Sequence, residues 1–136
     1  MILGIGTDLL DESRIKKVFS KFENRTLKKF LSEEEIAVFN GIEDEAKRVN
    51  FVAKRFSAKE SILKAMGIGL GRGLELKNIS IMNNEQGKPY IKFNSIAEEF
   101  IGNFYKKDMK NIKFVLSITD EKDLINAITI VSEENE

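Results

Sequence analysis

Residues 3–9 alternate between larger side chains and glycine or aspartate, which predicts a β-strand from Ile2 to Leu10. One face of this strand would carry the larger side chains and the other would carry two glycines and a carboxylate: Leu3, Ile5, Thr7 and Leu9 on the first, Gly4, Gly6 and Asp8 on the second. A glycine face allows another backbone or a ligand to approach closely. Asp8 is unexpected there, because it places a carboxylate on a strand face otherwise made of glycines.

After the strand, the apolar spacing changes to that of helices. A helix is expected from about Glu12, and a short helical piece follows at Thr26–Phe30. Ser32, with Glu35 three residues later, has the pattern of a capping box and predicts another helix start. The longest helix would run from about Glu45 to Met66 and end at Gly67.

The remainder of the chain predicts strands on either side of one more helix. Four short strands are expected, in two pairs: Ile79–Met82 with Tyr90–Phe93, and Phe114–Thr119 with Leu124–Val131. A helix over Ser95–Tyr105 would separate the pairs. Because no linker or repeat interrupts the pattern, we expect one α+β domain over residues 1–136, with a small antiparallel sheet packed with one long and several short helices.

The chain contains neither histidine nor cysteine. If it is an enzyme, its chemistry must use carboxylates, lysines, hydroxyls, backbone groups and a metal bound by oxygen, such as Mg²⁺. No stretch approaches the roughly 20 apolar residues that a membrane span needs. The first residues also lack the basic region of a signal peptide. We therefore expect a cytoplasmic protein with no membrane association.

Glu60 interrupts an apolar face of the long helix, formed at three- and four-residue spacings by Val49, Val52, Phe56 and Leu63. A buried carboxylate costs free energy unless it is paired or binds a cation. An ion pair with Lys64 or Arg55 is one interpretation, and a metal site is the other. Asp8 also has two interpretations: it could simply end the strand and cap the following helix, or it could bind a cation. Together, the two carboxylates suggest a shared cation, since Mg²⁺ is usually held by one or two protein carboxylates, substrate phosphates and waters.

Residues 67–73 are rich in glycine and include Arg72. Such a loop can present backbone N–H groups to an anion, although a helix end followed by a flexible loop has the same composition. The segment lacks both the Gly-Lys-Ser/Thr ending of a Walker motif and the strand-before-helix context of a Rossmann turn.

The chain is neutral overall, with 22 basic and 22 acidic residues, but its N-terminal helical region is basic. Cationic residues recur there at helical spacing and continue into the next segment: Arg14, Lys17, Lys21, Arg25 and Lys28. This pattern is typical either of a solvated helix face or of a surface that docks an acidic protein. Nucleic acid is not expected as a partner, because no interleaved aromatic residues offer a stacking platform.

Taken in order, these segments resemble the holo-(acyl-carrier-protein) synthase family of 4′-phosphopantetheinyl transferases. The first signature is Gly4–Leu9, followed by Arg14 on the next helix. The second is Arg55–Ala65, followed by a short glycine segment. The turn Gln86–Pro89 and the strand Val115–Thr119 match two further family motifs. The resemblance covers nearly the whole chain and implies the 4′-phosphopantetheinyl transferase fold.

The resemblance implies an Mg²⁺-dependent transfer of 4′-phosphopantetheine from coenzyme A to a serine of apo acyl carrier protein. This reaction releases adenosine 3′,5′-bisphosphate and serves fatty acid biosynthesis. Asp8 and Glu60 would hold the metal, and Lys64 would complete the catalytic set by contacting phosphate. The coenzyme A-binding residues would be Arg55, Lys59, Lys64, Gly67, Ile68, Gly69, Lys88 and Pro89. The carrier protein would dock on Arg14, Lys17, Lys21 and Arg25. The resemblance also implies a homotrimer with active sites between subunits.

One position departs from the family pattern. The family usually has histidine where this chain has Asp120, so any role of that histidine must be lost, moved or taken by a carboxylate. Two other functions remain open from sequence. One is a non-catalytic module that binds an acidic protein, and the other is a different nucleotide-dependent enzyme that uses the glycine-rich loop.

Overall fold

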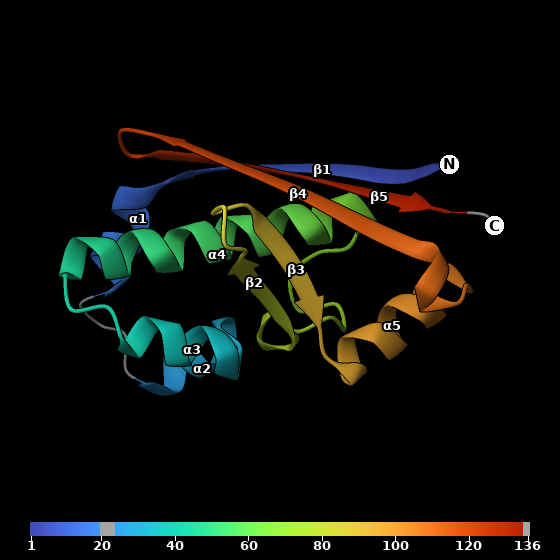
Figure 1. The fold of residues 1–136 in the computed structure, drawn as a ribbon, viewed down its shortest axis with the longest axis horizontal. Coiled ribbons are helices and arrows are strands. Elements are labelled where there is room, and N and C mark those ends of the chain that lie inside the picture. The colour runs from blue at the N-terminus through green and yellow to red at the C-terminus, as the bar shows by residue number, and fades with distance from the viewer. Residues whose placement is uncertain (20–23, 135–136) are drawn as a thin grey trace.

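The computed structural model describes residues 1–19 and 24–134 and contains every predicted element (Figure 1). The helices are α1 (Glu12–Phe19), α2 (Asn24–Phe30), α3 (Glu33–Asn40), α4 (Glu45–Met66) and α5 (Ser95–Tyr105), with 3₁₀ turns η1 (Leu76–Asn78) and η2 (Met109–Asn111). The strands are β1 (Ile2–Asp11), β2 (Ile79–Asn83), β3 (Pro89–Phe93), β4 (Ile112–Glu121) and β5 (Leu124–Glu133). Helices packed with two small antiparallel sheets confirm the predicted α+β class.

Local sequence signals set the helix ends where they were predicted. Ser32 and Glu35 form a complete capping box at the start of α3, each side chain accepting the other residue's backbone N–H. α4 begins after Asp44, whose carboxylate accepts the N–H of Lys47. It ends at Gly67, which adopts a left-handed conformation with φ of 76°.

The larger sheet joins the two ends of the chain. Its strand order is β1-β5-β4, with both pairs antiparallel. β4 and β5 form the predicted C-terminal hairpin, and β1 pairs with β5 along its other edge. α4 lies along one face of this sheet, so that the longest helix packs against strands from both termini (Figure 1).

β1 approaches α4 closely because two of its inward positions are glycines. A Cβ on Gly4 would overlap the backbone of Ala65, and a Cβ on Gly6 would overlap the backbone of residues 61–65. Only glycine therefore fits at these positions. The close approach lets Asp8, the next inward residue of β1, reach side chains of α4.

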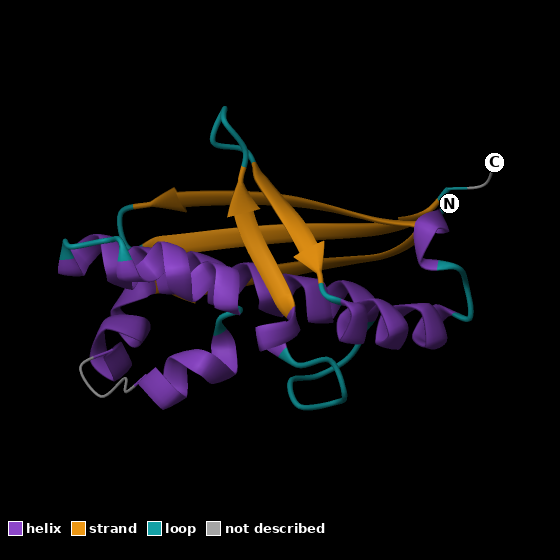
Figure 2. Ribbon diagram, turned by 60° about the horizontal axis from the view of Figure 1, so that its bottom comes forward, coloured by secondary structure: helices purple, strands orange, loops and turns teal. Residues whose placement is uncertain are grey.

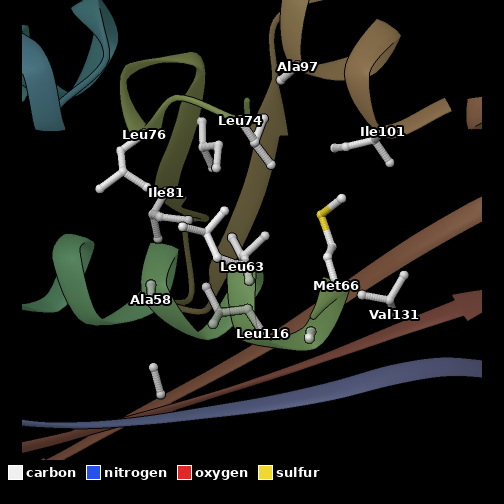
Figure 3. Close-up of a cluster of buried hydrophobic side chains, with 14 of the residues drawn as sticks. Ala58, Leu63, Met66, Leu74, Leu76, Ile81, Ala97, Ile101, Leu116 and Val131 are labelled. Atoms are coloured by element: carbon white, nitrogen blue, oxygen red, sulfur yellow. The ribbon is translucent and has the colours of Figure 1, made fainter. Parts of the chain in front are cut away.

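β2 and β3 form a separate hairpin that crosses α4, and α5 follows it (Figure 2). The main core lies where these elements meet. In Figure 3, Leu63 and Met66 of α4 lie in one cluster with Ile81 of β2, Ile101 of α5 and Val131 of β5. A second cluster surrounds the other half of α4, where Val52 of α4 and Ile125 of β5 lie with four residues from the N-terminal part of the chain: Leu10, Leu27, Leu31 and Phe39.

The face of the larger sheet that points away from α4 is apolar and exposed. Ile5 is 63% exposed, Leu9 67% and Val115 44%. The strand register aligns Ile5 with Ile130, and Ile130 with Val115, so these side chains form a row across the sheet. Within the described ranges, no helix is both long and apolar enough to cross a membrane.

Candidate active site

The seam between β1 and α4 brings together residues of both sequence signatures. Asp8 accepts hydrogen bonds from Ser57 Oγ at 2.7 Å and from Lys64 Nζ at 3.1 Å, one on each carboxylate oxygen. The Asp8 side chain is 12% exposed, whereas that of Lys64 is 51% exposed. Asp8 therefore does not merely end the strand. It is a nearly buried anion that accepts a hydrogen bond from a hydroxyl on one oxygen and from the ammonium of a half-exposed lysine on the other.

Glu60 lies half-buried on the same side of α4, between Ser57 and Lys64 in sequence. Burial raises the pKa of Glu60, the Asp8 carboxylate raises this pKa further, and Lys64 partly offsets both effects. Neither Lys64 nor Arg55 forms an ion pair with Glu60, and no hydrogen bond to its carboxylate occurs within the described part of the chain. The alternative that Glu60 is a structural ion-pair partner is therefore not realised.

Asp8 and Glu60 are the carboxylates that could hold a magnesium ion. Burial raises the pKa of Glu60, the Asp8 carboxylate adds to this effect, and a divalent cation between the two groups would offset their like charges. No group of three or more candidate metal ligands occurs in residues 1–19 and 24–134. Two carboxylates still suffice for Mg²⁺ when substrate phosphates and waters supply the other ligands. Carboxylate oxygens suit Mg²⁺, whereas zinc sites usually include cysteine or histidine, and this chain has neither.

Lys59, which the sequence predicts to bind coenzyme A, lies in the interior of this structure, away from the Asp8–Ser57–Lys64 group. Its side chain is fully buried, and its ammonium forms an ion pair with the equally buried Glu35. The ammonium also donates a hydrogen bond of 2.8 Å to the carbonyl oxygen of Phe30. Burial lowers the pKa of Lys59 to about 8, and the Glu35 carboxylate opposes that shift. A phosphate outside the protein cannot contact this group.

Arg55 is also buried, and its guanidinium forms hydrogen bonds with the β2–β3 hairpin. Its guanidinium donates to the Ile81 carbonyl oxygen at 3.2 Å and to Asn83 Oδ1 at 2.9 Å. It also stacks over the ring of Phe51, 3.8 Å from the centroid. A small hollow of about 120 Å³ brings Arg55 and Pro89 together, with Lys54, Ile81, Asn83, Gly87 and Ile118. Two predicted coenzyme A contacts thus line one cavity.

Lys88 is exposed in the turn that precedes β3. Its backbone N–H donates to Asn84 Oδ1 at 2.9 Å, and its carbonyl oxygen accepts the N–H of Asn84 at 2.9 Å. The turn backbone is therefore fixed, while the lysine side chain remains in solvent.

Of the two interpretations of the glycine segment after α4, an anion-binding loop and a helix end, the hydrogen bonds favour the helix end. The N–H of Gly67 donates to the carbonyls of Leu63 and Lys64, and the N–H of Ile68 donates to that of Leu63. These two donors satisfy the last turn of the helix and are not available to a phosphate. Gly69, whose carbonyl accepts the N–H of Arg72, is exposed. Gly69 is consequently the member of the predicted trio that can still approach a nucleotide through its N–H.

The basic residues of the N-terminal helices are exposed where they are described: Arg14, Lys17 and Arg25. Lys21, the fourth predicted docking residue, lies outside the described residues. Asp120 lies near the other half of α4, with its carboxylate 3.7 Å from Lys54 Nζ and 3.5 Å from Asn50 Nδ2. It does not join the Asp8–Ser57–Lys64 group.

Two residues of this region were not predicted from sequence. Ser57 holds Asp8, and its only sequence signal is its position three residues before Glu60, on the same helix face. Glu35 was recognised as a capping residue, but its ion pair with Lys59 joins positions 24 residues apart. Local spacing contains no information about such a contact.

Comparison with known proteins places this arrangement in a family. A family model described as the 4′-phosphopantetheinyl transferase superfamily matches residues 4–121. A curated relative, the holo-[acyl-carrier-protein] synthase of Orientia tsutsugamushi (strain Boryong), is 35% identical over 132 residues, covering 97% of this chain and 98% of the relative.

Solved structures agree with the sequence relatives. The crystal structure of a holo-[acyl-carrier-protein] synthase from Neisseria meningitidis matches with a TM-score of 0.83 and 30% identity, over 98% of this chain and 100% of that chain. A holo-(acyl-carrier-protein) synthase from Bacillus anthracis, in complex with CoA (3′,5′-ADP), matches with a TM-score of 0.77 and 30% identity, over 99% of each chain. On the family match and the full-length relatives together, this chain belongs to the 4′-phosphopantetheinyl transferase superfamily.

Proposed function

We propose that this protein transfers 4′-phosphopantetheine from coenzyme A to a serine of apo acyl carrier protein, with Mg²⁺ as cofactor. The observation that carries the proposal is the Asp8–Ser57–Lys64 group beside Glu60, formed by both family signatures. The relatives named holo-[acyl-carrier-protein] synthase support the reaction, and the Bacillus anthracis complex supports coenzyme A as the donor. The product would feed fatty acid biosynthesis in the cytoplasm.

The reaction asks the protein mainly for positioning and charge stabilisation. The serine oxygen would form a bond to the phosphorus that bears pantetheine, as the bond from that phosphorus to the bridging oxygen breaks and adenosine 3′,5′-bisphosphate leaves. Asp8 and Glu60 would hold Mg²⁺, which when bound would neutralise charge on the pyrophosphate. Lys64 is half-exposed, so its ammonium can turn from Asp8 toward a phosphate oxygen.

The serine proton must leave as the new P–O bond forms. Glu60 is the acceptor that we propose, because its half-buried carboxylate lies on the same side of α4 as Ser57 and Lys64, where the serine would be positioned. Ser57 would keep Asp8 in place through its 2.7 Å hydrogen bond. The chain needs no histidine for any of these roles.

The carrier protein would dock on the basic surface formed by Arg14, Lys17, Lys21 and Arg25. α1 follows β1 directly, so this surface begins six residues after Asp8. An acidic partner steered to α1 would approach close to the β1–α4 seam. Because exposed charges are screened by salt, docking should weaken as ionic strength rises.

We also propose that the protein forms a homotrimer, with active sites between subunits, as the family resemblance implies. The row of apolar side chains on the larger sheet is a suitable contact surface: Ile5 and Val115 are exposed, Ile130 between them is partly buried, and Leu9 is exposed beside the row. Burial of such side chains at about 25 cal/mol per Å² favours association.

The activity is tested by mass spectrometry of apo acyl carrier protein incubated with this protein, coenzyme A and Mg²⁺. We expect the carrier to gain one phosphopantetheine, and expect no gain in EDTA or with Glu60→Gln. A protein that binds the carrier without Mg²⁺ and without modifying it would instead be a non-catalytic module. Thermal protection by ATP, with none by coenzyme A, would indicate a different nucleotide-dependent enzyme.

A further inference from the structure

The interior contains an ion pair that the proposed chemistry does not use. Glu35 of α3 and Lys59 of α4 are both fully buried. Lys59 donates to Glu35 Oε1 and, at 2.8 Å, to the carbonyl oxygen of Phe30. Glu35 also accepts the N–H of Ser32 at 2.9 Å and, on its other oxygen, the N–H of Ile81 at 2.8 Å. The pair thereby connects α2, α3, α4 and β2.

Stability alone does not explain these charges. Desolvating two ions costs several kcal/mol each, and well-packed apolar residues of similar volume often stabilise a core as well or better. A buried ion pair does determine how the elements that carry it are oriented, because charge-assisted hydrogen bonds fix the geometry of the groups they join. The hydrogen bond from Lys59 to the carbonyl oxygen of Phe30 holds the end of α2 against α4.

Phe30 is the last residue of α2, a helix of seven residues. Its carbonyl is one of those that a helix end leaves without an intrahelical donor, and a cation there also suits the helix dipole. The Phe30 ring contacts Phe56 of α4 edge-on, with centroids 5.8 Å apart. α2 also carries Arg25, which is exposed and belongs to the proposed docking surface. The position of Arg25 relative to α4 therefore depends on a helix that Lys59 anchors.

Lys59 directly precedes Glu60 on α4. We infer that Lys59 is a positioning residue: by holding the end of α2 on α4, it sets the distance between the docked carrier protein and the Asp8–Glu60 site, and it makes no contact with coenzyme A. This inference rests on the proposed function. It assigns to a lysine of the second signature a role in carrier recognition rather than in phosphate binding.

The test compares Lys59→Met and the double variant Glu35→Gln/Lys59→Met with the wild type. Methionine keeps the length and apolar stem of lysine, and glutamine keeps one of the two Glu35 oxygens, which accept the Ser32 N–H and the Ile81 N–H respectively. If Lys59→Met alone does not fold, because it leaves Glu35 buried and unpaired, the double variant removes both charges and takes its place. Lys92→Met is the matched control, since Lys92 also pairs with a residue of α3, Glu34, but both side chains are 50% exposed.

Each folded variant is assayed for the KM of coenzyme A, the KM of apo acyl carrier protein, and carrier affinity by fluorescence anisotropy without coenzyme A. We expect about a tenfold weaker affinity and higher KM for the carrier, as for a docking-competent arrangement populated about 10% of the time. The KM of coenzyme A should remain within about twofold of the wild type. Lys92→Met should match the wild type in all three measurements.

A purely structural role would lower the melting temperature without separating the two KM values, and that result would overturn the inference. A tenfold rise in the KM of coenzyme A would also overturn it, since Lys59 would then act on the donor. If the wild type itself neither bound nor modified the carrier, the proposed function would fail and this inference with it. That outcome is distinct from the two failures seen with an active wild-type enzyme.

Discussion

Replacing Gly6 with alanine tests whether the close packing of β1 on α4 assembles the site. A Cβ at this position would lie 2.8 Å from the carbonyl carbon of Lys64, and closer still to the Ser61 carbonyl oxygen and the Ala65 amide nitrogen. Ordinary contact begins at 3.4 Å, and the Ser61 carbonyl oxygen is the closest of these atoms, so β1 must move away from it by about 1.2 Å to reach that distance. All of the obstructing atoms belong to the helix backbone, which cannot turn aside as a flexible side chain could.

The consequences follow from the position of Asp8, two residues further along β1. Its hydrogen bonds from Ser57 and Lys64, at 2.7 and 3.1 Å, cross the same seam and would lengthen as the strand moves. Overpacking of this kind typically costs about 1–3 kcal/mol of unfolding free energy. A misplacement on the order of 1 Å at a catalytic group lowers turnover by about a hundredfold. We therefore expect a larger loss of turnover than of stability.

The assays are urea denaturation for stability and mass-spectrometric rates of carrier modification at saturating Mg²⁺. Gly41→Ala is the control, because Gly41 has φ of −84° and a Cβ there would meet only the Val38 carbonyl oxygen, at 3.4 Å. That change should be neutral, or should stabilise by about 0.4–1 kcal/mol through the unfolded chain. Wild-type stability and turnover in Gly6→Ala would refute the close approach of strand and helix and its role in placing Asp8.

Three further predictions follow from the site and the surface. Burial and Asp8 raise the folded-state pKa of Glu60 above its unfolded value, near 4.5, so the stability gained from its protonation is full below that pH and is lost as pH rises through the folded pKa. In EDTA at pH 7, Glu60→Gln should therefore resist urea better than the wild type, and the difference should shrink toward pH 4; an equal difference at both pH values would contradict this. Leu9→Lys should shift the protein toward monomers in analytical ultracentrifugation, because Leu9 is 67% exposed on the apolar sheet face, and unchanged sedimentation would exclude that face as the subunit contact. Arg14→Glu should raise the KM of the carrier severalfold at low salt and much less at about 0.5 M salt, where screening already weakens docking, while an effect independent of salt would argue against electrostatic docking.

The sequence predicted the elements well because their signals are local. The range of α4 was predicted to the residue, since Gly67 stops it and the polar and apolar positions before it keep helical spacing. The inward face of β1 was also predicted, from the alternation of glycines with larger residues. The pairing of β1 with β5 was not predicted, because it joins strands from opposite ends of the chain and no turn specifies it.

The candidate site was predicted in part for the same reason. Asp8 and Glu60 were singled out because each carboxylate interrupts a face otherwise made for the interior, and Lys64 then followed from the family signature. The commitment of the Gly67 and Ile68 N–H groups to the helix end agrees with the helix-end interpretation of the glycine-rich segment, because a glycine that ends a helix normally uses these donors in that way. Oligomeric state and the single-domain organisation stay predictions.

Helix geometry explains why one lysine of the second signature reaches the site and another does not. Successive residues of an α-helix turn by about 100°, so Ser57 and Lys64, three residues before and four after Glu60, lie within about 60° and 40° of it around the axis. Lys59 is adjacent to Glu60 in sequence but about 100° away from it, and α3 and the end of α2 cover that side of α4. Lys59 therefore lies on a different surface of α4 from Glu60. The role of Lys59 must follow from the elements that pack against its own surface. For Lys59 the contact is the helix that carries Arg25, which is why carrier affinity, and not coenzyme A affinity, is the property to measure.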